Sequence, residues 1–207
     1  MNREAAKYPG LNLSVSHGND DEAAESLIFG FWVFLMSDAI LFGMVFATYV
    51  TSLRATAGGP GPYQLYDIKS VFIETLLLLL SSFTFGLVSL ALKYRHNIFR
   101  LLVWLTVTLL LGVTFLGFEL RDFQNMFANG GYPSRSGFLS AFFDLVPLHG
   151  IHVFVGCIWL VCIMGQIARY GIDTQTKLGI MRLALFWHFL DIIWIAIFSI
   201  VYIGSIR

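Results

Sequence analysis

The apolar residues of this 207-residue chain fall into five long blocks, and this pattern limits the possible folds more than any other feature. A helix needs about 20 predominantly apolar residues to cross a bilayer. Five segments meet this requirement, at about 27–53, 70–93, 99–121, 138–168 and 182–205. Charged residues make up only 13% of the chain. The sequence therefore predicts an all-α, polytopic membrane bundle of five transmembrane helices.

The residues outside these blocks set the expected ends and orientation of the bundle. Residues 1–26 have neither the basic start nor the apolar run of a secretory signal, so we expect a flexible polar tail before a five-helix domain at 27–207. One side of the predicted bundle carries Arg3, Lys7, Lys93, Arg95, Arg100, Arg169, Lys177 and Arg182, and the other carries Arg54, Lys69, Arg121, Arg135 and Arg207. Because cytoplasmic loops are enriched in Lys and Arg, the N-terminus is expected inside and the C-terminus outside.

Several classes of function find no support in the residues. The formal net charge is zero and there is no basic tract, so the sequence gives no support for nucleic-acid binding. Cys157 and Cys162 lie five residues apart in one predicted helix, so they cannot bridge each other. The chain has no nucleophile elbow, zinc-protease motif or phosphate-binding loop, so no catalytic centre of its own is expected.

The candidate functional residues are polar side chains inside the predicted spans: Asp38, Glu74, Glu119, His149, His152, His188 and Asp191. Counting about 1.5 Å per residue predicts two layers. Asp38, His188 and Asp191 fall in an inner-to-middle layer, whereas the two glutamates, His149 and His152 fall in an outer layer. The outer set suits a hydrogen-bonded structural cluster, a proton relay or a metal site. A haem between His152 and His188 is a further alternative that their different predicted depths disfavour.

His188 and Asp191 lie three residues apart within the apolar stretch 185–206, so they share one helix face. A charge in hydrocarbon costs about 2.5 kcal/mol or more, so such residues are usually paired. We therefore expect the two residues to face protein and to mark a function or an assembly contact. Asp38 is a lone acid near mid-bilayer. It could form a structural hydrogen bond to His188 or to another helix, or it could act in proton handling or lipid binding.

Small residues recur at helical spacing in two of the predicted spans. Ser82 and Gly86 are four residues apart, as are Gly43 and Ala47. Such spacing lets helices approach closely. It fits ordinary packing within the bundle and also a docking face for another subunit.

Four segments together resemble one known family. They are IFGFWVFLMSDAILFGMVFATY (28–49), FIETLLLLLSS (72–82), RSGFLSAFFDLVPLHGIHVFVGCIWL (135–160) and LFWHFLDIIWI (185–195). In this order they are similar to subunit III of the haem–copper terminal oxidases. The five spans resemble the five-helix subunit III of cytochrome bo-type ubiquinol oxidases, because the seven-span relatives carry two additional N-terminal helices.

The resemblance implies a non-catalytic subunit of a proton-pumping quinol oxidase in the bacterial inner membrane. Haem and copper would reside in a partner subunit I, and the chain itself would hold no cofactor. Oxidase subunits I, II and a small subunit IV, together with membrane phospholipids, are the implied partners. Asp38 falls where seven-span members carry a membrane-embedded glutamate. An independent intramembrane metalloenzyme and a small proton-coupled transporter are the alternative functions.

Overall fold

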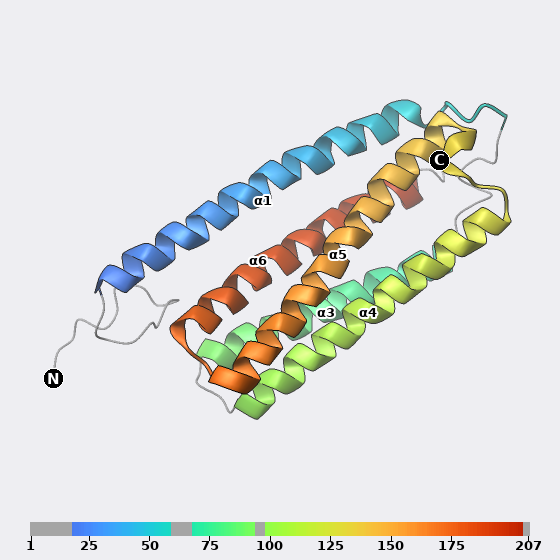
Figure 1. The fold of residues 1–207 in the computed structure, drawn as a ribbon. Helices are drawn as coiled ribbons and strands as arrows, with labels where there is room; N and C mark the ends of the chain where they lie inside the picture. The colour runs from blue at the N-terminus through green and yellow to red at the C-terminus, as the bar shows by residue number, and fades with distance from the viewer. Residues whose placement is uncertain (1–17, 59–67, 94–97, 205–207) are drawn as a thin grey trace.

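The computed structural model of the chain describes residues 18–58, 68–93 and 98–204, which form five long helices (Figure 1). These are α1 (Gly18–Ser52), α3 (Ile68–Lys93), α4 (Ile98–Ala128), α5 (Gly137–Tyr170) and α6 (Thr174–Ile197). A short 3-10 turn, η1 (Pro133–Arg135), precedes α5, and a π-helical turn, η2 (Phe198–Ile203), continues α6. Each long helix contains a stretch long and apolar enough to cross a membrane, so the predicted all-α architecture is confirmed.

Three helix ends differ from the predicted ones. Helix α1 begins at Gly18, so residues 18–26 are helical, and the rest of the predicted tail lies outside the described residues. Helix α4 continues to Ala128 instead of 121, and α6 begins at Thr174 instead of 182. The prediction ended each helix where its apolar run ended. A helix instead ends where its backbone is capped or interrupted, and polar residues can extend it by two turns.

Helix α5 illustrates how local sequence fixes these ends. The Ser136 hydroxyl accepts a hydrogen bond from the Leu139 N–H at 3.2 Å, which satisfies one free donor of the first turn. At the other end, Gly171 has a φ of 74° and its N–H donates to the Ile167 carbonyl at 3.0 Å. Between these caps the helix runs without interruption through Pro147.

Consecutive helices run in opposite directions, which gives the bundle two ends (Figure 1). We call the end that holds Gly18 the first end, and the end where α1 finishes and α3 begins the second end. Helix α6 packs against α1, α3 and α5, whereas α1 contacts only α5 and α6 among the long helices with substantial contacts. In the most apolar stretch of each helix, the buried share is 56% for α6 and 11% for α1. Helix α6 is therefore the central element, and α1 lies at the periphery.

The centre of the bundle is built around the indole of Trp187 in α6, which is 1% exposed. Its Nε1–H donates to the Ser81 hydroxyl of α3 at 3.0 Å. Glycines of α4 and α5 flank the ring so closely that a Cβ at Gly112 would lie 3.0 Å from the indole Cη2, and one at Gly156 would lie 3.2 Å from Cζ3. These glycines allow α4 and α5 to approach the indole.

Two hydrogen bonds join the second end of α1 to its neighbours. The Tyr49 hydroxyl donates to the Val201 carbonyl in η2 at 3.4 Å. Just beyond α1, the Ala55 carbonyl accepts from the Phe138 N–H of α5 at 3.2 Å. The π-helical turn thus supplies a backbone acceptor to another helix.

Candidate functional site

Asp38 and His152 form a polar contact between α1 and α5, near the middle of both helices' apolar spans. The His152 Nε2 lies 3.4 Å from the Asp38 Oδ2, and the two side chains are mostly buried. The other ring nitrogen, Nδ1, lies 2.7 Å from the Leu148 carbonyl. Because a carbonyl only accepts, Nδ1 carries a proton. A hydrogen bond between Nε2 and the carboxyl group therefore needs one further proton, held by either group.

This pairing overturns the predicted layers. His152 was expected in an outer layer, apart from Asp38, but the two residues lie at one depth. Asp38 lies within one residue of the midpoint of the span Ser26–Ser52, and His152 lies within two residues of the midpoint of Gly137–Tyr170. The prediction counted depth from approximate span ends. A helix of 34 residues is much longer than a bilayer is thick, so its centre is a better reference than its end.

A second polar group lies closer to the second end and contains Glu74, Glu119 and His149. His149 is fully buried, between Phe115 with a ring distance of 6.0 Å and Trp194 with a ring distance of 5.3 Å. The Glu119 carboxyl group packs against Gly150, where a Cβ would lie 2.6 Å from Oε2. Glycine at this position therefore makes room for the acid.

Trp194 connects this second group to α3. Its Nε1–H donates to the Thr75 hydroxyl at 3.1 Å, next to Glu74 in the sequence. Within the described chain, one oxygen of each glutamate and both ring nitrogens of His149 are buried without a hydrogen-bond partner. Three of the four residues predicted for the outer layer thus come together, whereas the fourth, His152, pairs with Asp38.

His188 and Asp191 form the third group, on the side of α6 that faces α3. The His188 Nδ1 lies 2.8 Å from the Ser82 hydroxyl and 3.8 Å from the Asp191 Oδ2. The two residues therefore share one helix face, as their spacing requires. Ser82 links the pair to α3, and the sequence pattern alone did not assign it this contact.

The hydroxyl residues of α3 that bond to these groups were not predicted from the sequence. Ser81, Ser82 and Thr75 receive or share hydrogen bonds with α6 at Trp187, His188 and Trp194. From Thr75 to Ser81 along α3, the partner in α6 changes from Trp194 back to Trp187, as expected for two antiparallel helices. The sequence shows small hydroxyl residues in one predicted span and Trp and His residues in another. Which of them pair can be read only once the two helices are placed side by side.

The arrangement does not bring the candidate ligands of a metal or haem together. In the described part of the chain, no three His, Cys, Asp or Glu side chains are grouped closely enough to hold a metal ion. His152 contacts Asp38 and His188 contacts Ser82, so the two histidines proposed as haem ligands face different partners. Cys157 and Cys162 are both free thiols.

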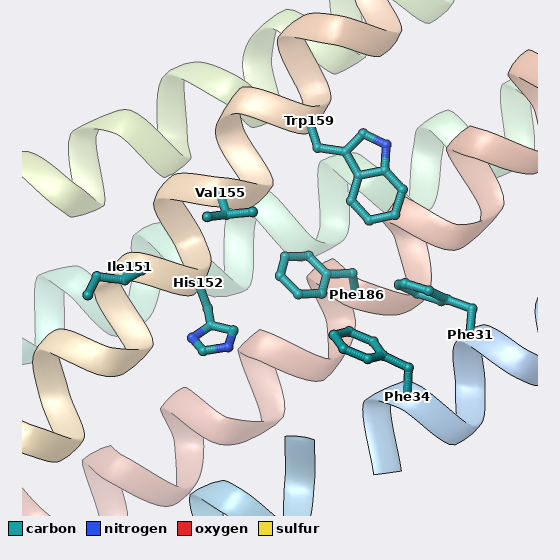
Figure 2. Close-up of a pocket in the computed structure, with 7 residues that line it drawn as sticks. All are labelled: Phe31, Phe34, Ile151, His152, Val155, Trp159 and Phe186. Carbon is teal, nitrogen blue, oxygen red and sulfur yellow. The ribbon is translucent and has the colours of Figure 1, made fainter. Parts of the chain in front are cut away.

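A cavity of about 330 Å³ opens between α1, α5 and α6 (Figure 2). Its α1 residues precede Asp38 in the chain, so it lies on the first-end side of the Asp38–His152 pair. Its walls are Phe31, Phe34, Ile151, His152, Val155, Trp159 and Phe186. The aromatic rings contact one another, with Phe31 and Trp159 edge to face at 5.7 Å. In this lining, polar side-chain atoms occur only in His152 and in the indole of Trp159, and both His152 nitrogens already face Leu148 and Asp38, so the cavity suits an apolar occupant.

Comparisons with known proteins agree along nearly the whole chain. The sequence model of the family described as cytochrome c oxidase subunit III matches residues 12–206. The cytochrome bo(3) ubiquinol oxidase subunit 3 of Pseudomonas aeruginosa is 43% identical over 187 residues, which cover 90% of this chain and 89% of that protein. The quinol oxidase subunit 3 of Bacillus subtilis is 39% identical over 194 residues, covering 90% of this chain and 95% of that protein.

Proposed function

This chain belongs to the cytochrome c oxidase subunit III family, and we propose that it is the subunit III of a respiratory quinol oxidase. Its role is to assemble with and stabilise the subunits that carry out electron transfer from quinol to oxygen. The observation that supports this most is the similarity to quinol oxidase subunits 3, which extends over about nine-tenths of both chains. No observation favours an independent metalloenzyme or transporter.

The polar groups in the spans are consistent with an accessory role. Each of the three groups joins residues from different helices or lies against one, so each can hold the bundle in register. The haem and copper of the complex are assigned to a subunit I, with a subunit II and a small subunit IV as further partners. These assignments follow from the family resemblance and stand as part of the proposal.

The proposal also includes a place and an orientation for this multi-pass membrane protein. The bacterial sources of the similar proteins support the bacterial inner membrane. The distribution of Lys and Arg supports an N-terminus inside and a C-terminus outside. Arg121 and Arg182, which the sequence placed at span ends, lie inside α4 and α6. The described five-helix domain follows an N-terminal segment for which a polar tail is proposed.

Binding of membrane phospholipid is a further part of the proposed role. The cavity between α1, α5 and α6 offers aromatic and aliphatic walls of a size that fits part of an acyl chain. Both ring nitrogens of His152, at the edge of the cavity, already face the Leu148 carbonyl and Asp38. This combination supports a lipid tail in the cavity with its polar part nearer the membrane surface.

Co-purification tests the proposed function. An affinity-tagged form of this chain, extracted from its native membrane in mild detergent, is expected to bring down a haem-containing polypeptide in equal stoichiometry. Haem spectra and subunit mass analysis of the same preparation provide the measurement. A tagged chain that is folded and membrane-inserted but never associated with a haem–copper subunit would refute the proposal.

Asp38→Asn separates structural support from proton handling at the α1–α5 contact. The amide keeps the shape of the carboxyl group and can donate a hydrogen bond to the His152 Nε2, so we expect normal assembly. An amide cannot take up and release a proton near neutral pH, so proton uptake during turnover should fall. The decrease should be smaller than about 10²-fold, the effect typical of a residue that acts in the reaction itself. Oxygen consumption and proton uptake by the purified complex provide the measurement.

Asp38→Glu is the matched control, since it retains an acid at this position. It should restore proton uptake if the acid is responsible. Failure of the Asp38→Asn complex to assemble would show instead that the role of Asp38 is structural. Unchanged turnover in that variant would remove Asp38 from proton handling.

A further inference from the structure

His188 presents an imidazole to the outside of the bundle at the depth where the membrane is most apolar. It lies within one residue of the midpoint of the span Gln175–Ile203. Even so, 44% of its side chain is exposed. Nδ1 faces Ser82, and among the described residues Nε2 has no hydrogen-bond partner. Lipid tails offer no hydrogen bond at this depth, and lipid headgroups do not reach it.

Asp191 is the buried acid next to this imidazole. Its side chain is only 7% exposed, yet neither carboxylate oxygen has a hydrogen-bond partner in the described chain. One of these oxygens lies 3.8 Å behind the imidazole. A polar side chain placed over Nε2 would hydrogen-bond the imidazole and fix its orientation toward Asp191 and Ser82.

The surface around His188 has the shape of a helix-docking site. It lies where α6 packs against α3, and we call it the α3–α6 face: Leu79, Ser82, Gly86, His188, Ile192 and Ile195. Ser82 and Gly86 follow one another at four-residue spacing, and a Cβ built at Gly86 would meet nothing within 4 Å. Ile192 is 65% exposed and Ile195 is 45% exposed. Small residues beside apolar ones let a neighbouring membrane helix approach closely.

From these observations we propose that the α3–α6 face is where a transmembrane helix of another oxidase subunit docks, with one of its polar side chains hydrogen-bonded to the His188 Nε2. This rests on the proposed function, which makes the chain one subunit of a larger complex. It assigns to His188 and Asp191 a role between subunits in addition to any role within the bundle. The depth of His188 favours a protein partner over a lipid headgroup.

Site-specific photo-crosslinking in the intact complex tests the location. Ile192→p-benzoylphenylalanine places a photoreactive ring on the α3–α6 face, and Leu110→p-benzoylphenylalanine places one at a matched position of α4 that is 61% exposed. We expect position 192 to crosslink to another subunit and position 110 to crosslink to lipid. Crosslinks from 192 to lipid alone, to a second copy of this chain, or at equal yield from both positions would overturn the inference.

A pair of glycine substitutions tests the same face without a chemical probe. Gly86→Leu should lower the fraction of this chain retained in the complex after detergent washing at least about fivefold, since overpacking an interface is costly. Gly117→Leu is the matched control: a Cβ there also meets nothing within 4 Å, but Gly117 is in α4, outside the α3–α6 face, so this variant should be retained like the wild type. Equal retention of both variants would overturn the inference. Absence of the wild-type chain from the complex would instead refute the proposed function itself.

Discussion

Trp187→Ala is expected to lower the free energy of unfolding of the chain in detergent by about 3 kcal/mol, a value at the low end of the range for Trp→Ala in soluble cores. The indole is 1% exposed and its N–H donates to Ser81, so the substitution removes packing and a hydrogen bond together. The low end applies because lipid or detergent, not water, surrounds separated helices. Loss of packing then accounts for most of the effect.

The exposed Trp32 of α1 is the matched control for this experiment. It is 48% exposed, so Trp32→Ala should change the free energy of unfolding by no more than about 0.5 kcal/mol. Unfolding is measured by titration with SDS, using circular dichroism to follow helix loss. Similar effects of the two substitutions would show that Trp187 is not the centre of the packing.

Gly156→Leu is expected to destabilise the bundle by about 1–3 kcal/mol through overpacking. A Cβ at this position would already lie 3.2 Å from both the Phe186 Cε1 and the Trp187 Cζ3. The rest of a leucine side chain has no space unless the indole moves. The same substitution in a Trp187→Ala background should cost less, because the leucine can occupy the space that the indole leaves.

The double-mutant cycle measures this coupling directly. We expect the combined effect of the two substitutions to differ from their sum by about 0.5–3 kcal/mol, as for residues in contact. Gly165→Leu, on the same helix, is the control, because a Cβ there meets nothing within 4 Å. Strict additivity of Gly156→Leu and Trp187→Ala would contradict the close contact between α5 and the indole.

The number and type of the helices could be predicted from the sequence because a membrane leaves few alternatives for an apolar block of this length. Their ends could not be predicted as well. The polar segment 174–181 reads as a loop by hydropathy, but it follows the cap at Gly171 and forms the first two turns of α6. Hydropathy reports where lipid ends, whereas caps and glycines report where a helix ends.

The partners of the polar residues required the relative rotation and tilt of the helices. The spacing of His188 and Asp191 was enough to place them on one face, because that relation lies within one helix. The pairing of Asp38 with His152 joins α1 to α5, and a count of residues from approximate span ends assigned them to different depths. Relations between helices depend on packing at Trp187 and its flanking glycines, which no periodicity in a single segment records.

The way α1 is attached has a consequence for its motion. Among the described residues, the hydrogen bonds from the α1 segment to other helices are made by Tyr49 and Ala55, both at the second end. Toward the first end, Phe31 and Phe34 contribute only apolar and ring contacts around the cavity. Helix α1 can therefore swing outward about its second end without breaking a backbone hydrogen bond, provided that the Asp38–His152 contact at its middle opens. Exchange of a lipid chain in the cavity then requires that the aromatic rings separate and that the single Asp38–His152 contact opens, so the occupant can turn over while the rest of the bundle stays folded.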